Sequence, residues 1–413
     1  MPTSPPLEVP AQASETKPPA IPRRASPPRI LKRMLSLQDF EEAARRRLPR
    51  PIFGYVAGAA EDNRTFRENR AIFDDYLFST RVLVNVAQRS QSVELLGHRY
   101  SSPFGIAPMG IVALSCYRGD LVLAESACEA GIASIMSGSS LIPLEAVAAA
   151  APGTWFQAYL PGDPARIHAL IDRVAQAGFE TLVVTVDLPV SANRENNIRT
   201  GFTTPLRPNL RLAWDGLTRP RWMVDTFLRT LLCHGMPHFE NSFATRGAPI
   251  VSGSVLRDFS ARDHLSWAHL KAIRAQWKGP LVVKGILSVE DALHARHHGA
   301  DAIILSNHGG RQLDGAISAM RVLPAVTGAL GDYPVMLDGG FLRGSDVLKA
   351  LALGARMVFI GRPFNYAAAV ASHAGVAHAV KLLAEEIDRN MAMLGVTNCR
   401  ELGREHLVPV REH

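Results

Sequence analysis

The sequence has few cysteines. Only four occur in 413 residues, and no two of them have the C-x-x-C spacing. This scarcity argues against a disulfide-stabilised scaffold, so we expect a reduced intracellular protein. Long apolar runs are also missing, because none reaches the roughly 18 residues that suggest a spanning helix. The N-terminus lacks the apolar core of a signal peptide. The cysteines are Cys116, Cys128, Cys233 and Cys399.

Acidic residues are in the minority. The formal net charge is +7 and the isoelectric point is about 9.4. A basic balance suits anionic small ligands, membrane surfaces and nucleic acids alike, so charge alone does not choose among them. We expect no nucleic acid as a partner.

The two ends of the chain differ from the rest. Residues 1–30 are rich in proline, alanine and serine and carry Arg23, Arg24 and Arg29. Such a segment cannot bury enough apolar surface to order itself, so we expect a disordered tail over residues 1–33. Hydrophobic residues make up 47% of the chain, enough for a true core. One domain over residues 34–406 is expected, with a short tail at 407–413.

Short apolar strands alternate with amphipathic helical stretches from Ser102 onward. Eight buried strands separated by helices predict an α/β fold with a parallel sheet, and the count favours a (β/α)8 TIM barrel over a doubly wound sheet. The predicted strands are Phe104–Ala107, Ala133–Met136, Trp155–Ala158, Leu182–Val186, Leu281–Val283, Ala302–Leu305, Val335–Leu337 and Met357–Ile360; the predicted helices include Asp120–Ala130, Pro164–Ala177, His264–Gln276, Val289–His298 and Ser345–Leu353.

One connection is far longer than the others. After the fourth strand, residues 188–262 form an insertion rich in proline, glycine and arginine. Loops of that length are rare without a function. Its interleaved basic and aromatic residues, such as Arg211, Trp214, Arg221 and Trp222, suit a membrane interface or a docking segment. The alternative is a solvated insertion that packs on its own barrel.

Chemically active side chains follow the strands. In (β/α)8 enzymes the active site lies at the C-terminal ends of the strands. His308 could act there as a general base, with Asp187 holding the imidazolium. Arg311 could bind a carboxylate through two hydrogen bonds, and Lys284 supplies a fixed cation. The loops after the last two strands, at Asp338–Gly340 and Gly361–Arg362, suit a phosphate.

One motif is highly specific. Ser306–Asp314, S-N-H-G-G-R-Q-L-D, resembles the active-site signature of the FMN-dependent L-2-hydroxy acid dehydrogenase and oxidase family. The similarity runs from about Ser36 to about His406. It includes W-F-Q-A-Y (Trp155–Tyr159), T-V-D-L-P (Thr185–Pro189) and L-V-V-K-G (Leu281–Gly285).

The resemblance implies a role for each matching residue. The implied catalytic residues are His308, Asp187, Tyr159 and Lys284. The implied substrate contacts are Tyr55, Tyr159, Arg194, His308 and Arg311. The implied FMN contacts are Pro108, Met109, Gly110, Ser137, Gln157, Thr185, Lys284, Ser306, Asp338, Gly339, Gly340, Arg343, Gly361 and Arg362.

Three positions depart from the family pattern. Leu342 replaces the first of two arginines after D-G-G-x, which leaves Arg343. Ser139 stands where glycolate oxidases carry tryptophan, which implies more room for a substrate side chain. Met109 replaces a small or hydroxyl residue beside the flavin.

The implied reaction is FMN-dependent oxidation of an (S)-2-hydroxy acid, lactate-like or mandelate-like, to the 2-oxo acid. The insertion resembles that of membrane-associated bacterial lactate and mandelate dehydrogenases. We therefore expect a quinone or similar electron acceptor and peripheral attachment to the inner face of the cytoplasmic membrane. The resemblance also suggests a homotetramer.

Four alternatives stay open from the sequence, among them a different FMN barrel such as an isomerase and a non-catalytic membrane-binding protein. An oxidase would pass the electrons to O2 and release H2O2. A Schiff-base aldolase would use Lys284 as its nucleophile. No metal is expected. Two groups of residues could be metal ligands, but surface positions on a helix and a loop explain them better. The groups are His294, His297 and His298, and Cys233, His234 and His238.

Overall fold

Eight parallel strands close into a barrel, which confirms the predicted (β/α)8 fold. The computed structural model describes residues 28–203, 205–207, 210–253 and 262–410. All eight predicted strands are present with ends shifted by at most a few residues. The barrel strands, in sequence order, are β4 (Phe104–Ile106), β5 (Ala133–Ser137), β6 (Trp155–Ala158), β7 (Leu182–Thr185), β8 (Leu281–Ile286), β9 (Ala302–Leu305), β10 (Val335–Asp338) and β11 (Met357–Ile360).

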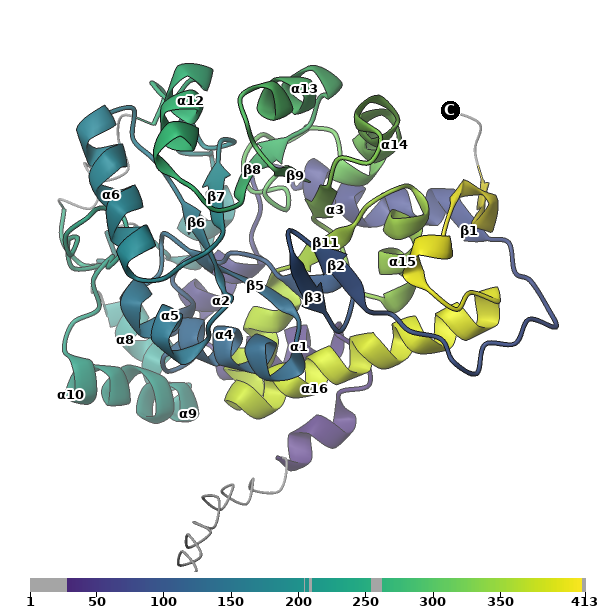
Figure 1. Cartoon of the computed structure of the whole chain (residues 1–413). Coiled ribbons are helices and arrows are strands. Elements are labelled where there is room, and N and C mark those ends of the chain that lie inside the picture. The colour runs from purple at the N-terminus through teal and green to yellow at the C-terminus, as the bar shows by residue number, and fades with distance from the viewer. Residues whose placement is uncertain (1–27, 204, 208–209, 254–261, 411–413) are drawn as a thin grey trace, which may run out of the picture.

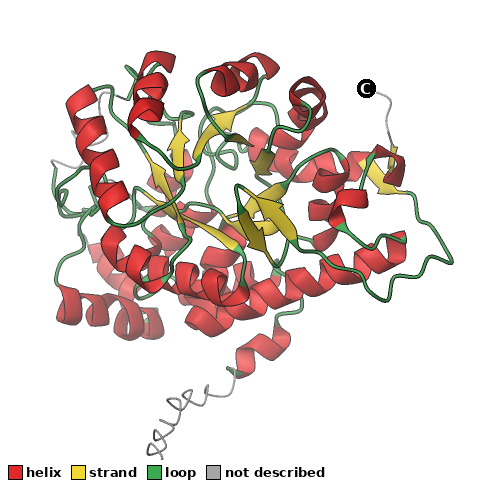
Figure 2. Ribbon diagram, viewed as in Figure 1, coloured by secondary structure: helices red, strands yellow, loops and turns green. Residues whose placement is uncertain are grey.

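Helices surround the barrel (Figure 2). Their apolar faces pack on the outward side chains of the strands and form the larger of two core clusters. The starts of several helices are fixed locally: Asp163 and Ser288 accept hydrogen bonds from backbone N–H groups in the first turns of their helices. The helices are α4 (Gly119–Ala130), α5 (Leu144–Ala150), α6 (Pro164–Gln176), α12 (Trp267–Gln276), α13 (Val289–His297), α14 (Ala319–Leu330), α15 (Gly344–Ala352) and α16 (Arg362–Leu394).

A second core fills the barrel itself. Inward side chains such as Val183, Ile304 and Phe359 form it. A hairpin of β2 (Val93–Leu95) and β3 (His98–Tyr100) closes the N-terminal mouth, where the Trp155 indole donates a hydrogen bond to the Tyr100 hydroxyl at 3.1 Å. Among the described residues, the C-terminal mouth of the barrel is the one that stays open.

Two short elements lie in segments that the sequence assigns to the tails. Residues 1–27 lie outside the described residues, but Arg29–Arg33, assigned to the disordered tail, forms the 3-10 helix η1 with Leu31 buried. The expected C-terminal tail begins with a strand, β12 (Leu407–Pro409), which pairs antiparallel with β1 (Tyr76–Phe78). The elements before the barrel are α1 (Asp39–Arg47), α2 (Arg50–Ala57), α3 (Arg64–Ala71) and η2 (Ile72–Asp75); η3 (Val112–Leu114) follows β4, and η5 (Cys399–Glu401) and η6 (Arg404–His406) follow α16.

The insertion between β7 and β8 is largely helical. In Figure 1 its helices gather on one side of the barrel. Trp222 is buried and donates a hydrogen bond to the Leu114 carbonyl at 2.7 Å, so part of the insertion packs on the barrel. Its elements are α7 (Glu195–Thr200), α8 (Leu210–Leu217), α9 (Pro220–Trp222), the π-helical turn η4 (Met223–Leu228) and α10 (Arg229–His234).

Helix α16 is long and apolar enough to cross a membrane by length and composition. Half of its most apolar window is buried inside the protein, however, and the helix packs against α1 and α4. Its path breaks at Ala371 and Ser372, which have non-helical dihedral angles. These features are typical of a core helix.

Candidate active site

A cavity of about 1430 Å³ opens at the C-terminal ends of the strands. Its walls come from the strand ends, the insertion and the helices before the barrel. The structure brings most of the predicted site residues to this cavity: Tyr55, Pro108, Met109, Gly110, Tyr159, Arg194, Lys284, His308, Arg311, Asp338, Gly339, Gly340, Gly361 and Arg362 line it. The lining does not include Ser137, Gln157, Thr185, Asp187, Ser306 or Arg343.

The loop after β9 has an unusual backbone. His308, Gly309 and Gly310 follow one another with φ values of 58°, 64° and 77°, all in the left-handed region. A Cβ atom on Gly310 would lie 2.7 Å from the Phe66 nitrogen, so only glycine lets the loop pass this close to α3. The curled loop turns the His308 ring toward the cavity, at an energetic cost that is common at functional sites.

His308 is held between two partners. Its Nδ1 lies 3.1 and 3.2 Å from the two carboxylate oxygens of Asp187, and its Nε2 lies 3.4 Å from the Tyr159 hydroxyl. Burial lowers the pKa of His308 and outweighs the opposing effect of Asp187. Burial also raises the pKa of Asp187, but the nearby His308 brings it below its ordinary value. The pair therefore favours a neutral imidazole beside a carboxylate at neutral pH.

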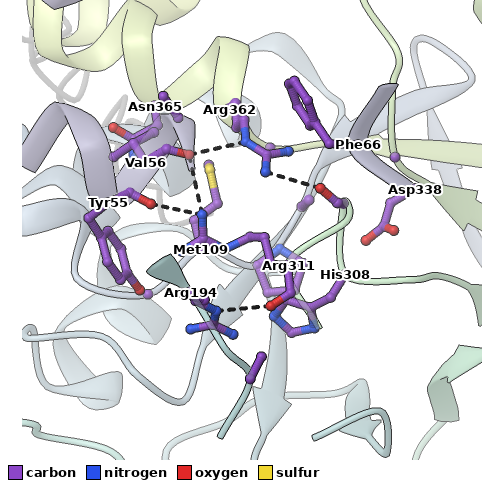
Figure 3. A pocket seen from close by; sticks show the side chains of 18 of the residues that line it. Tyr55, Val56, Phe66, Met109, Arg194, His308, Arg311, Asp338, Arg362 and Asn365 are labelled. Atoms are coloured by element: carbon purple, nitrogen blue, oxygen red, sulfur yellow. Dashed lines mark hydrogen bonds between the residues drawn. The ribbon is translucent and has the colours of Figure 1, made fainter. Parts of the chain in front are cut away.

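Two arginines flank the histidine. Figure 3 shows Arg194, Arg311 and His308 around one part of the cavity, with Tyr55 nearby. The Arg311 guanidinium donates to the carbonyls of Tyr55 at 2.8 Å and Gly58 at 2.7 Å, and Arg194 Nε donates to the Arg311 carbonyl at 2.9 Å. Burial lowers the pKa of Arg311, and Arg194 lowers it further by repulsion. A bound carboxylate would relieve that repulsion.

Lys284 belongs to a buried network across three strands. Its Nζ lies 2.9 Å from Asp338 Oδ2 and 2.8 Å from Ser306 Oγ, and Ser306 Oγ donates to Asp338 Oδ1 at 2.6 Å. Burial lowers the pKa of Lys284, but the carboxylates of Asp338 and Asp187 bring it above the ordinary lysine value. The amine is therefore a fixed cation, which does not suit a Schiff-base nucleophile.

The far end of the cavity suits a phosphate. Gly339 and Gly340, after β10, and Gly361, just before α16, all line it. Gly361 is the N-cap of α16, so the positive end of the helix dipole lies at this part of the cavity and suits an anion. Arg362 lies there, but its Nε and Nη2 donate to the carbonyls of Val56, Gly58 and Gly309 at 3.0–3.1 Å.

Buried polar atoms support a planar cofactor between the His308 side of the cavity and its phosphate end. Gln157 Nε2 and Thr185 Oγ1 are buried at the ends of β6 and β7 without a hydrogen-bond partner in the described protein. Asn365 Oδ1, on the cavity wall, shares this property. A ligand bound at this end of the barrel would supply partners for these groups. The carbonyl and ring N–H groups of a flavin match them, so the residues present fit FMN.

The three departures from the family pattern have visible consequences. Arg343 forms an ion pair with Glu386 at 3.1 Å and does not reach the cavity. Ser139 lines the cavity and lies against Gly110, where an added Cβ atom would come within 3.0 Å of the Ser139 Cβ. Met109 lines the cavity beside Gly361.

Sequence reasoning missed several wall residues. Arg262 stacks on the Tyr159 ring at 4.7 Å, and Phe202 contacts the Tyr55 ring with centroids 4.6 Å apart. Both come from the insertion, whose path no periodic pattern predicts. Arg70, from α3, also lines the cavity.

The histidines considered as metal ligands lie elsewhere. Trp267 stacks with His294 and His298, at centroid distances of 5.6 and 5.3 Å. Within the described ranges, no three His, Cys, Asp or Glu side chains gather into a group able to hold a metal ion.

The chain matches known proteins over most of its length. The family model for FMN-dependent dehydrogenases matches residues 44–409. (S)-Mandelate dehydrogenase of Pseudomonas putida is 36% identical, over 91% of this chain and 94% of that protein. L-Lactate dehydrogenase of Ectopseudomonas mendocina (strain ymp) is 38% identical, over 90% of this chain and 98% of that protein. The crystal structure of monotopic membrane protein (S)-mandelate dehydrogenase superimposes with a TM-score of 0.86 at 36% identity, covering 91% and 99% of the two chains.

Proposed function

Because the chain belongs to the family of FMN-dependent dehydrogenases, we propose that it oxidises an (S)-2-hydroxy acid with a lactate-like or mandelate-like side chain to the 2-oxo acid. The observation that carries the proposal is the placement of His308, backed by Asp187, beside Arg311 and Arg194 on one cavity wall. A base and a carboxylate clamp at this spacing fit a substrate whose hydroxyl neighbours its carboxylate.

The protein's own residues would hold the substrate and move a proton. FMN supplies the two-electron acceptor when bound. Arg311 and Arg194 would bind the carboxylate, with the Tyr55 ring beside them. The neutral His308 takes a proton at Nε2, and Asp187, at Nδ1, stabilises the imidazolium that forms. Tyr159, 3.4 Å from Nε2, would orient the substrate oxygen.

Lys284 would act on the flavin and not on the substrate. Its fixed positive charge would stabilise negative charge on a bound flavin. The predicted FMN contacts Pro108, Gly110, Ser137 and Ser306 remain part of this proposal. Ser139 is a small residue on the cavity wall and would leave room for a side chain larger than a methyl group, which favours a mandelate-like acid.

An anaerobic substrate panel tests the reaction. The purified protein should carry FMN, and an (S)-2-hydroxy acid should bleach its absorption in the absence of oxygen. Lactate, glycolate, longer aliphatic acids and mandelate would be compared. Admission of oxygen then separates the acceptors: slow recovery supports a dehydrogenase, whereas rapid recovery with H2O2 supports the oxidase. A protein that binds no FMN, or that no member of the panel bleaches, would contradict the proposal.

Activity should persist below the ordinary histidine pKa. The base works only when neutral, so the rate of flavin reduction falls as pH drops through the pKa of His308. Because burial lowers that pKa beneath its ordinary 6.5, we expect the acid limb to lie below pH 6.5. Asp187→Asn removes a neighbour that raises the pKa of His308, so the limb should shift further toward acid while the maximal rate falls. A limb centred above pH 6.5 in the wild-type enzyme would contradict this assignment.

The insertion would attach the protein to a membrane. On α8, Leu210, Trp214 and Leu217 are 91%, 67% and 66% exposed, and their spacing puts them on one helix face. Leu232 on α10 is 85% exposed as well. Exposed apolar side chains among arginines suit the interface of an anionic bilayer. We propose the inner face of the cytoplasmic membrane, with quinone as electron acceptor.

Polar substitutions should release the protein from lipid. Replacing Leu210, Trp214 and Leu217 by glutamine should abolish cosedimentation with anionic vesicles, while anaerobic bleaching by the substrate stays within about twofold of wild type. Leu77→Gln with Val408→Gln is the control, since these residues are 58% and 50% exposed on the β1–β12 sheet. Unchanged cosedimentation of the triple variant would refute the docking surface. The homotetramer remains a prediction that light scattering can test.

A further inference from the structure

The loop that follows β10 lacks a cation where the family resemblance expects one. Leu342 lines the cavity in place of the first arginine. The second arginine, Arg343, forms an ion pair with Glu386 at 3.1 Å, away from the cavity. Arg362 already donates three hydrogen bonds to carbonyl groups. A dianionic phosphate at this end would therefore receive less positive charge than the family pattern provides.

Arg70 lies at this gap, although it comes from α3. It lines the cavity together with Gly339, Gly340 and Leu342. One Nη1 hydrogen bond reaches the Gly340 carbonyl at 3.1 Å. Gly340 has φ of 82°, and a Cβ atom there would lie 1.9 Å from the Asn69 carbonyl. The bare glycine thus lets α3 touch the loop and brings the guanidinium to the position beside Leu342.

Asp346 fixes the direction of this arginine. Its carboxylate is buried and accepts hydrogen bonds from the backbone N–H groups of Leu342 at 3.0 Å and Arg343 at 2.9 Å. The same carboxylate pairs with Arg70 through Nη1 and Nη2, the latter at 2.9 Å. One carboxylate therefore orients both the loop and the guanidinium. Within the described chain, the Nε–H and the second Nη2–H of Arg70 remain available to an anion.

We propose that Arg70 binds the FMN phosphate, together with Arg362 and the amides around Gly339 and Gly340, in the place of the arginine that Leu342 replaces. The proposal rests on the FMN-dependent function above. A guanidinium held in a fixed orientation is well suited to phosphate, because little side-chain freedom is lost on binding. The Asp346 ion pair lowers the local charge but gives that orientation.

Flavin affinity with and without the phosphate tests this role. Release of flavin from the diluted holoenzyme, followed by fluorescence, gives Kd for FMN, and the protein reloaded with riboflavin gives the matched value. Arg70→Met should weaken FMN by about tenfold or more and leave riboflavin within about twofold. Arg356→Met is the matched control and should change neither value, because Arg356 pairs with Asp332 at 3.4 Å outside the cavity. Adding L342R to R70M should restore FMN affinity.

Equal losses for FMN and riboflavin in R70M would overturn the proposal, because they would show a structural role only. Unchanged FMN affinity would overturn it as well. If R70M fails to fold, Arg70→Lys keeps a cation beside Asp346 and should still weaken FMN more than riboflavin; equal effects would again contradict the role. These measurements need no substrate. A wild-type protein that binds FMN but is not bleached by hydroxy acids would count against the proposed reaction alone.

Discussion

Replacing His308 by alanine is expected to give a yellow protein that retains FMN but is bleached by an (S)-2-hydroxy acid about 10²–10⁴ times more slowly than wild type. The ring contacts Asp187 at 3.1 Å and Tyr159 at 3.4 Å, and its burial keeps it neutral at working pH. The variant lacks the imidazole that pairs with Asp187 and accepts the substrate proton. Anaerobic stopped-flow absorbance measures the rate.

The matched control for this variant is His168→Ala, on the exposed face of α6, which should reduce its flavin at the wild-type rate. Flavin content and thermal unfolding should be similar in the wild type, the His308→Ala variant and the His168→Ala variant. The His308→Ala change removes no residue from the part of the cavity that would hold the phosphate. Bleaching of the His308 variant at the wild-type rate would refute the base assignment.

Replacing Arg311 by methionine should lower kcat/KM for flavin reduction about 10²–10³-fold, because the substrate carboxylate would lose its buried partner. The guanidinium lies on the cavity wall, held by the carbonyls of Tyr55 and Gly58, so its direction is set before the substrate arrives. Arg311→Lys should recover little, since an ammonium lacks the planar fork. Steady-state kinetics with an artificial electron acceptor give these values.

Arg356→Met serves again as the control, because this arginine pairs with Asp332 outside the cavity. Partial rescue of the Arg311 variant by added guanidinium would support loss of the cation rather than a general distortion. An unchanged KM and kcat in the methionine variant would exclude the carboxylate clamp.

The barrel was predictable because its signal is local and repeated. Each strand is a short apolar run followed by polar or glycine residues, and closure of the barrel brings those ends together. Residues at the strand ends, such as Lys284 and His308, could therefore be placed before the structure was known. The motif around His308 also predicted the cofactor, FMN, through its resemblance to a known family. The spacing of the residues alone does not identify a cofactor.

Contacts between distant segments were not predictable. The three residues of β12 pair with β1 across more than three hundred positions, and so short a strand gives no periodic pattern. The ion pairs of Arg343 and Arg70 likewise depend on how α16 and α3 meet the loop after β10. Sequence could show that Leu342 departs from the family, but not which side chain lies beside it.

The segments before the barrel close the active site by contacting parts of the chain made last. Ala60 donates a backbone hydrogen bond to Gly310, Arg362 donates to Val56 and Gly58, and α1 packs along α16. During synthesis, the first hundred or so residues thus emerge long before their partners exist. These early segments cannot make their final contacts until α16 has left the ribosome. We therefore expect the flavin to be loaded only after synthesis of the chain is complete.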